Sequence, residues 1–237
     1  MLSLVTVKAT GGDYATAMYN IDADPVLRHV ALVAENGAIE TAGMRNHGSI
    51  PTNRSQPDLK DVSIRVFRNP GAAGMVYGLN NAEESYVKLQ NVSIMTSYGD
   101  TNYGIYNSGN SVINIVDSRI NVIYGQIAYG IRTAGRPSIV DHVEIKVTGA
   151  SSVTGIDSIS QDMVIRNLYL DVSGEENVTG ISTTARQEWY DSVVKVSTGI
   201  DPVTTIGIFN VVGNLTLNRF DIQVNRGSAE GINNLDS

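Results

Sequence analysis

The chain has 237 residues, 42% of them hydrophobic, and it carries a formal net charge of −7 with a pI near 4.9. This composition is enough to bury a core, and the lack of cysteine excludes disulfides and cysteine-based metal sites or nucleophiles. No stretch approaches the roughly 18 apolar residues of a membrane span, and no basic cluster forms, so we expect neither a membrane span nor a nucleic-acid partner.

Residues 1–26 are predicted to form an N-terminal strand and a capping helix. The first eight residues lack the pattern of a signal peptide, so we expect none there. Apolar residues at i, i+3, i+4 and i+7 mark one helical face: Tyr14, Ala17, Met18 and Ile21. Asp13 is a suitable N-cap, and Asp24–Pro25 would end the helix.

Residues 27–237 are predicted to form one continuous repeat domain. A motif of Gly, then Ile or Leu, any residue, and Asn, Thr or Ser begins at Gly78, Gly104, Gly130, Gly155, Gly180, Gly207 and Gly231. Successive glycines are separated by 26, 26, 25, 25, 27 and 24 residues, and Gly43 begins a degenerate earlier copy. A fixed period in this range indicates stacked structural repeats. Residues 48–58 are expected to be a loop from an early coil.

A second motif recurs within each repeat and predicts a strand that follows a corner. In residues 59–66, apolar Val62, Ile64 and Val66 alternate with polar residues, which indicates a strand with one buried face. The alternation slips by one residue before each strand, and Asp or Asn tolerates such a bend. We expect corners at Asp61, Asn91, Asp117, His142, Asn167 and Asp191.

These patterns together predict an all-β fold, a single-stranded right-handed parallel β-helix of about eight coils, with equivalent strands about 4.8 Å apart. A repeat of this length is too short for a WD40 blade, and the regular spine of a leucine-rich repeat is missing. The polar residues three positions after each glycine should form a structural hydrogen-bonded column. Trp189 has the register of a core residue.

The chain resembles the pectate-lyase-like superfamily of β-helix proteins. Its opening, residues 5–14, is similar to the strand and Gly-rich turn at the start of many such domains. The repeat type of residues 103–107 resembles modules of phage tail and bacterial surface proteins. Residues 139–144 have a partial likeness to a pectate-lyase Asp-His segment, but the family's remaining catalytic signatures are missing. The resemblance implies the fold, and the superfamily includes both enzymes and inert stalks.

Candidate site residues gather on the outward face of three adjacent coils. Carboxylates at the separations that glycosidases use can act as general acid and base, and the candidates are Asp141, Glu144 and Asp171. Candidate sugar-binding residues on the same face are Arg166, Tyr169, Tyr190 and Lys195. The histidines are too scattered for a metal site, and no motif calls for a cofactor, so we expect neither.

The sequence favours a non-catalytic module: a stalk or receptor- and carbohydrate-binding rod of a phage tail or cell-surface protein. The last repeat stops at Ser237 in mid-coil, so we expect a fragment of a longer chain or an oligomer, with a homotrimer as the first expectation. The expected partner is a polysaccharide or cell-surface glycan. The alternative is a polysaccharide lyase or glycoside hydrolase, and a third option is an ice-binding face, although the polar column holds few threonines.

Overall fold

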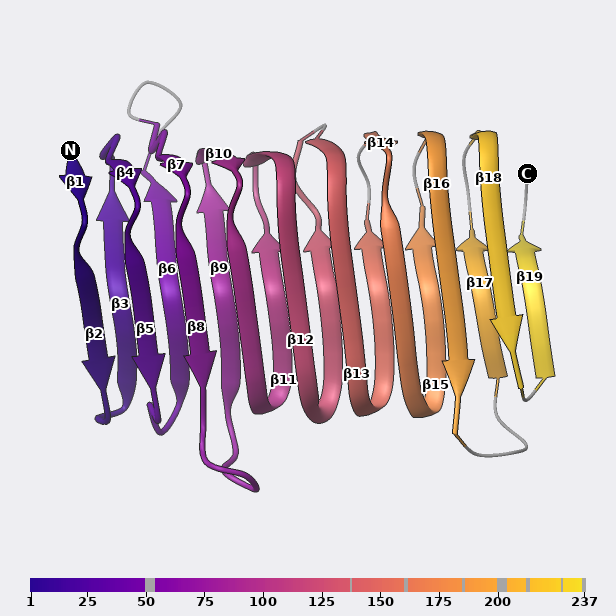
Figure 1. The fold of residues 1–237 in the computed structure, drawn as a ribbon, viewed down its shortest axis with the longest axis horizontal. Coiled ribbons are helices and arrows are strands. Elements are labelled where there is room, and N and C mark those ends of the chain that lie inside the picture. The colour runs from indigo at the N-terminus through magenta and orange to yellow at the C-terminus, as the bar shows by residue number, and fades with distance from the viewer. Residues whose placement is uncertain are drawn as a thin grey trace.

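The computed structural model describes residues 1–49, 54–136, 138–159, 162–184, 186–199, 204–211, 214–226 and 228–235. They form a right-handed parallel β-solenoid of about eight turns, drawn as a rod with the two termini at opposite ends in Figure 1. The predicted fold class is therefore confirmed. In the described residues no helix has the length and apolarity that crossing a bilayer requires.

Three ladders of parallel strands run along the rod, and each coil contributes one strand to every ladder. The first ladder contains β1 (Leu2–Ser3), β4 (Val26–Arg28), β7 (Asp58–Lys60), β10 (Tyr86–Gln90), the starts of β12 (Val112–Thr133) and β13 (Ser138–Ser158), β14 (Met163–Arg166), and the starts of β16 (Gln187–Thr198) and β18 (Leu215–Asn225). Among the described residues these nine strands define nine levels, which we number from the N-terminal end of the rod; eight turns of the solenoid lead from level one to level nine.

The second ladder contains β2 (Thr6–Thr10), β5 (Ala31–Glu35), β8 (Ser63–Phe67), the start of β11 (Ser93–Asn107), the middles of β12 and β13, the start of β15 (Tyr169–Thr183), and the ends of β16 and β18. The third contains β3 (Tyr14–Ile21), β6 (Glu40–Gly48), β9 (Met75–Glu83), the ends of β11, β12, β13 and β15, then β17 (Thr204–Asn210) and β19 (Ser228–Asn234). In Figure 1, β11, β12, β13 and β15 curve round the lower edge from the second ladder to the third.

The repeat motif places its isoleucines directly over one another in the core. Ile105 pairs with Ile131, Ile131 with Ile156 and Ile156 with Ile181, and all four are fully buried. The motif glycine is required by close packing rather than by backbone conformation. A Cβ on Gly104 would lie 2.5 Å from the carbonyl oxygen of Gly130 and would also meet the side chain of Ile120 on the facing ladder.

The predicted polar column is confirmed as a buried hydrogen-bonded ladder. Asn81 donates from Nδ2 to Oδ1 of Asn107 at 2.7 Å, and Asn107 donates to Oγ1 of Thr133 at 3.1 Å. Asn107 Nδ2 also donates to the backbone carbonyl of Ser111 at 3.1 Å, so the column satisfies backbone groups at the corner. Trp189 is fully buried, as its register predicts.

Each predicted corner between the first and second ladders has a left-handed backbone. The φ angles are 55° at Asp61, 51° at Asn91, 52° at Asp117, 50° at His142, 50° at Asn167 and 51° at Asp191. Short polar side chains lower the cost of this conformation because they hydrogen-bond locally. His142 is therefore a corner residue, as the repeat register indicates.

The predicted capping helix is wrong, because residues 14–21 form strand β3. Ala17 to Asn20 occupy the register of the Gly-Ile-Tyr-Asn motif: Met18 pairs with Met44 and Asn20 with Asn46. Asn20 Nδ2 donates to Asn46 Oδ1 at 2.7 Å, so the first two levels have a polar pair in the same register column. The four apolar residues do not share one face, since Ala17 and Met18 pack against the core whereas Tyr14 is 60% and Ile21 53% exposed.

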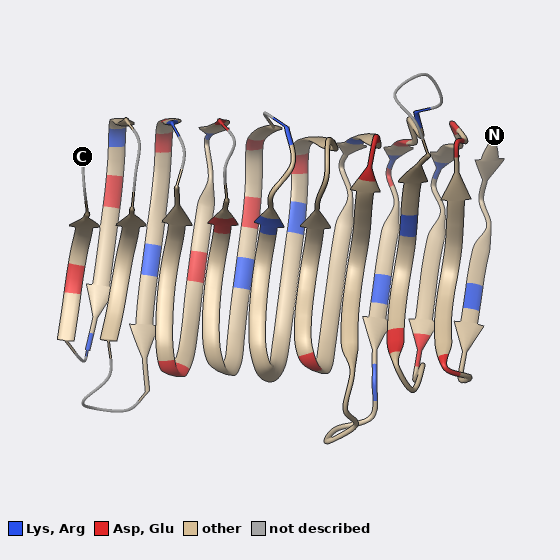
Figure 2. Ribbon diagram, turned by 180° about the vertical axis from the view of Figure 1, so that it is seen from behind, with Lys and Arg blue, Asp and Glu red and all other residues tan. Residues whose placement is uncertain are grey.

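The loop predicted over residues 48–58 lies between β6 and β7, and residues 50–53 within it are outside the described residues, as is Ser237 at the end of the chain. A second excursion, residues 68–74, connects β8 to β9 at the lower edge of Figure 1. Charged positions are spread along the coils with both signs interleaved (Figure 2). Several pairs link adjacent levels, such as Lys8 with Glu35 at 2.7 Å and Arg28 with Asp58 at 2.7 Å.

Candidate functional site

The seven site residues predicted from the sequence lie on levels six to eight, on both sides of one corner: Asp141, Arg166 and Tyr190 on the first ladder, and Glu144, Tyr169, Asp171 and Lys195 on the second. Strand alternation points them away from the core, and the register sets them in three columns. One column joins Asp141, Arg166 and Tyr190, another joins Glu144 and Tyr169, and the third joins Lys146, Asp171 and Lys195. The predicted gathering of acidic, basic and aromatic groups is therefore present, and the roles assigned to these residues stay predictions.

Each of the three predicted carboxylates contacts a cationic or amide group. Asp141 Oδ1 lies 2.8 Å from Nδ1 of His142 and accepts a 3.0 Å hydrogen bond from Asn167. Glu144 pairs with Arg119 at 2.7 Å, and Asp171 lies 3.8 Å from Nζ of Lys146. Exposed pairs of this kind add about 0–1 kcal/mol each to stability. They hold the carboxylates as fixed hydrogen-bond acceptors along the rod.

The Tyr169 and Tyr190 rings of the candidate site each lie beside a cationic side chain. Nζ of Lys195 lies 5.3 Å from the ring centroid of Tyr169, which is 39% exposed. The guanidinium carbon of Arg166 lies 5.9 Å from the ring of Tyr190, whose hydroxyl donates to Glu188 Oε2 at 3.3 Å. An exposed ring beside a cation can contact both the apolar face of a sugar and an attached anionic group.

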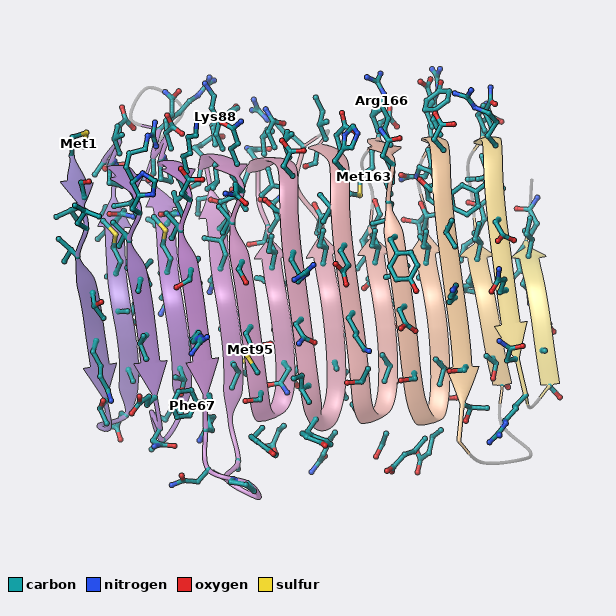
Figure 3. All side chains as sticks on the ribbon, viewed as in Figure 1. Met1, Phe67, Lys88, Met95, Met163 and Arg166 are labelled. Atoms are coloured by element: carbon teal, nitrogen blue, oxygen red, sulfur yellow. The ribbon has the colours of Figure 1, made fainter. Side chains whose placement is uncertain are left out.

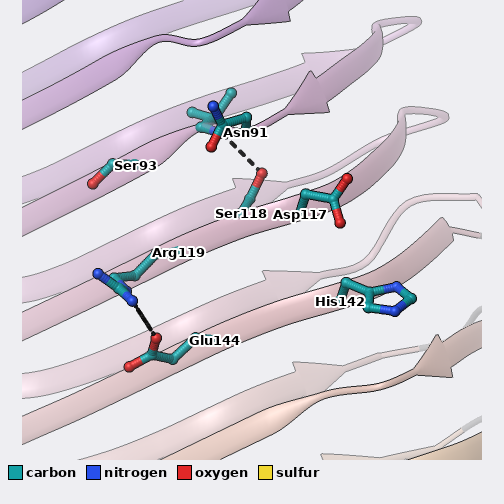
Figure 4. Close-up of a pocket in the computed structure, with 8 residues that line it drawn as sticks. Asn91, Ser93, Asp117, Ser118, Arg119, His142 and Glu144 are labelled. Carbon is teal, nitrogen blue, oxygen red and sulfur yellow. Dashed lines mark hydrogen bonds and ion pairs between the residues drawn. The ribbon is translucent and has the colours of Figure 1, made fainter.

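A polar hollow of about 400 Å³ lies beside this face on levels four to six. It is lined in part by the corner residues Asn91, Asp117 and His142, and by the Arg119–Glu144 pair (Figure 4). Sequence reasoning identified Glu144 but interpreted the corner residues as purely structural. Their common outward position in every repeat was the signal that could have found the hollow. No group of three or more His, Asp or Glu side chains among the described residues is arranged to hold a metal ion.

Tyrosines on the outward face of the third ladder form a separate stack. The rings of Tyr77 and Tyr103 are 5.0 Å apart and nearly parallel, and those of Tyr103 and Tyr129 are 5.2 Å apart. Burial raises the pKa of the Tyr77 and Tyr103 hydroxyls, so both stay neutral in the physiological range. The Arg132 guanidinium covers Tyr129 at 5.0 Å. Because the ring faces contact one another, this stack stabilises the sheet rather than offering a platform for a sugar.

No protein-family model matches the chain, and no curated protein matches it. Among solved structures, the chain is similar to the Streptococcus pneumoniae surface protein and adhesin PfbA. The two share 8% sequence identity, with a TM-score of 0.31 over 97% of this chain and 91% of that chain. This similarity is too low to carry an argument, so the fold rests on the strand pairing described above.

Proposed function

We propose that this chain is a non-catalytic β-helix rod that binds an extended glycan along the outward face of its second ladder. The observation that carries the proposal is the register of Tyr169 and Lys195 with Glu144, Lys146 and Asp171 over three levels. Register positions repeat about every 4.8 Å along the rod, so successive sugars of a linear chain would each lie over one level.

The contacts of the carboxylates support binding over hydrolysis or elimination. A general acid must hold a proton near neutral pH, which requires burial or a neighbouring like charge. Glu144 is instead 41% exposed and paired with Arg119, and Asp141 is bonded to its own neighbours. These groups are suited to accept hydrogen bonds from sugar hydroxyls.

Binding can be tested by calorimetry with a panel of acidic and neutral polysaccharides. We expect at least one to bind without being cleaved, and Tyr169→Ala combined with Lys195→Ala to weaken binding about tenfold or more. Ile139→Ala is the control, since Ile139 is 44% exposed on the first ladder, outside this face. If the double variant binds the polysaccharide as tightly as the control variant, the assignment of this face is contradicted. If no polysaccharide of the panel binds, the proposed function is contradicted.

We further propose that copies of the chain assemble through the outward face of the third ladder, as a homotrimer on a virion or cell surface. This face exposes apolar groups, including Tyr19 at 56% and Ile127 at 39%. Two arginines of this face are paired within the chain, Arg45 with Glu40 at 3.2 Å and Arg132 with Asp157 at 3.2 Å, which suits contact with an identical face. Light scattering of the unsubstituted chain should give three times the monomer mass, and Ile127→Glu should lower that mass. A monomeric mass for the unsubstituted chain would overturn this proposal.

A further inference from the structure

The lower corner that follows the second ladder has tyrosine at two levels where a bulky residue is disfavoured. The backbone is left-handed at Asn36, Tyr98, Tyr124 and Gly149, with φ between 56° and 75°. Glycine and asparagine suit this conformation, whereas a tyrosine there is strained. Strained residues persist where the surroundings hold them, and they concentrate at functional sites.

The two corner tyrosines form a stack with one open end. Their rings are 5.2 Å apart with an angle of 19° between the planes. Tyr124 is covered on its other side by Gly149, where an added Cβ would lie 2.7 Å from the ring. The other side of Tyr98 faces level three, to which the 68–74 excursion belongs. Tyr98 is thus the terminal ring of the stack.

A hollow of about 420 Å³ lies between Tyr98 and this excursion. Apolar side chains line it: Phe67 and Met95, which are 38% and 39% exposed, and Pro70. Figure 3 shows Phe67 and Met95 on neighbouring coils near the lower edge of the rod. A volume of this order accommodates a small ligand, and exposed aromatic rings around it favour the apolar face of a sugar.

Two arginines give this hollow a positive charge on an otherwise acidic chain. Arg65 is exposed on the outward face of β8. Arg68 is only 4% exposed and donates from Nη2 to the carbonyl oxygen of Ala38 at 2.9 Å. Its Nε and Nη1 atoms are buried and have no hydrogen-bond acceptor among the described residues. Because these nitrogens are buried, Arg68 acts on the hollow through its charge, which Asp100 offsets in part, and Arg65 is the arginine that an anionic ligand in the hollow can contact directly.

We propose that this hollow binds one acidic sugar residue, a pyranose ring carrying a carboxylate. The ring would stack against Tyr98 and Phe67, and the carboxylate would meet Arg65, with Arg68 strengthening the local positive field. The inference rests on the proposed glycan-binding function and extends it. A continuous column of register partners joins this hollow to the proposed face: Arg65, Met95, Asn121, Lys146, Asp171 and Lys195. The five steps span about 24 Å, so one glycan can reach both.

The test titrates the whole chain with glucuronic acid and with glucose while following ligand saturation transfer by NMR. We expect glucuronic acid to bind and glucose to bind more weakly. Arg65→Met should weaken glucuronic acid binding about tenfold. Tyr98→Asn should weaken it about two- to tenfold, and it preserves the corner because asparagine already occupies the equivalent position at Asn36. Lys88→Met, at an exposed lysine of β10 on the first ladder, should leave binding of the single sugar unchanged.

The possible outcomes separate this inference from the proposed function. Binding of a polysaccharide without binding of glucuronic acid would overturn the corner site and leave the rod's function standing. Binding of glucuronic acid that is unchanged in both Arg65→Met and Tyr98→Asn would do the same. If neither glucuronic acid nor any polysaccharide binds, the corner site and the proposed glycan-binding function are both overturned.

Discussion

Replacing one motif glycine with alanine should destabilise the rod, and the last level offers a control. In Gly104→Ala the new Cβ would lie 2.5 Å from the Gly130 carbonyl oxygen and would also collide with Ile120. Overpacking of this kind costs about 1–3 kcal/mol. The equivalent Gly231→Ala meets nothing within 4 Å. Both variants gain the same reduction in unfolded-state entropy, about 0.4–1 kcal/mol, so their difference isolates the collision.

Thermal unfolding followed by far-UV circular dichroism can measure this difference. At about 2–4 °C per kcal/mol for a chain of this size, Gly104→Ala should melt about 2–12 °C below Gly231→Ala. Equal melting temperatures would show that the glycine column does not separate tightly packed ladders, and the physical explanation of the repeat would be refuted.

The remaining predictions concern the polar ladder, one buried acid and the catalytic alternative. Asn107→Ala removes the buried hydrogen bonds that Asn107 accepts from Asn81 and donates to Thr133, and it should cost about 1–3 kcal/mol in urea unfolding; an unchanged midpoint would contradict the structural role of the column. Burial raises the pKa of Glu40 above its ordinary 4.5, so the free energy of unfolding should fall as the pH rises through and above that value. Glu40→Gln should remove this fall, and identical pH profiles of melting temperature for both proteins would refute it. If any polysaccharide is cleaved, activity abolished by Asp141→Asn or Glu144→Gln would favour the enzyme, whereas the proposed function predicts no turnover to lose.

Most of the fold could be predicted because each coil repeats the same local solutions. Corners such as Asp61 and Asn167 are visible from the slip in alternation, and the core isoleucines from the glycine period. The first level was missed because Ala17 replaces the motif glycine, so a helical spacing of apolar residues competed with the repeat.

The candidate site was only partly predictable. Outward residues such as Tyr169 and Lys195 follow from alternation within regular coils. The corner hollow depends on Phe67 and Tyr98, which are brought together across a longer repeat that contains the 68–74 excursion. Neither the left-handed backbone at Tyr98 nor the burial of Arg68 has a local sequence signal, because both depend on packing against neighbouring levels.

The vertical register of the coils is tested most directly by disulfide trapping, which the lack of native cysteine makes clean. Met95 and Asn121 are register partners on adjacent levels, whereas Met95 and Arg119 are offset by two residues on the same face. Partner Cα atoms should be about 4.8 Å apart and the offset pair about 8 Å, beyond the roughly 7 Å limit for a disulfide. We predict rapid cross-linking of Met95→Cys with Asn121→Cys and none of Met95→Cys with Arg119→Cys. Preferential cross-linking of the offset pair would contradict the stacked register.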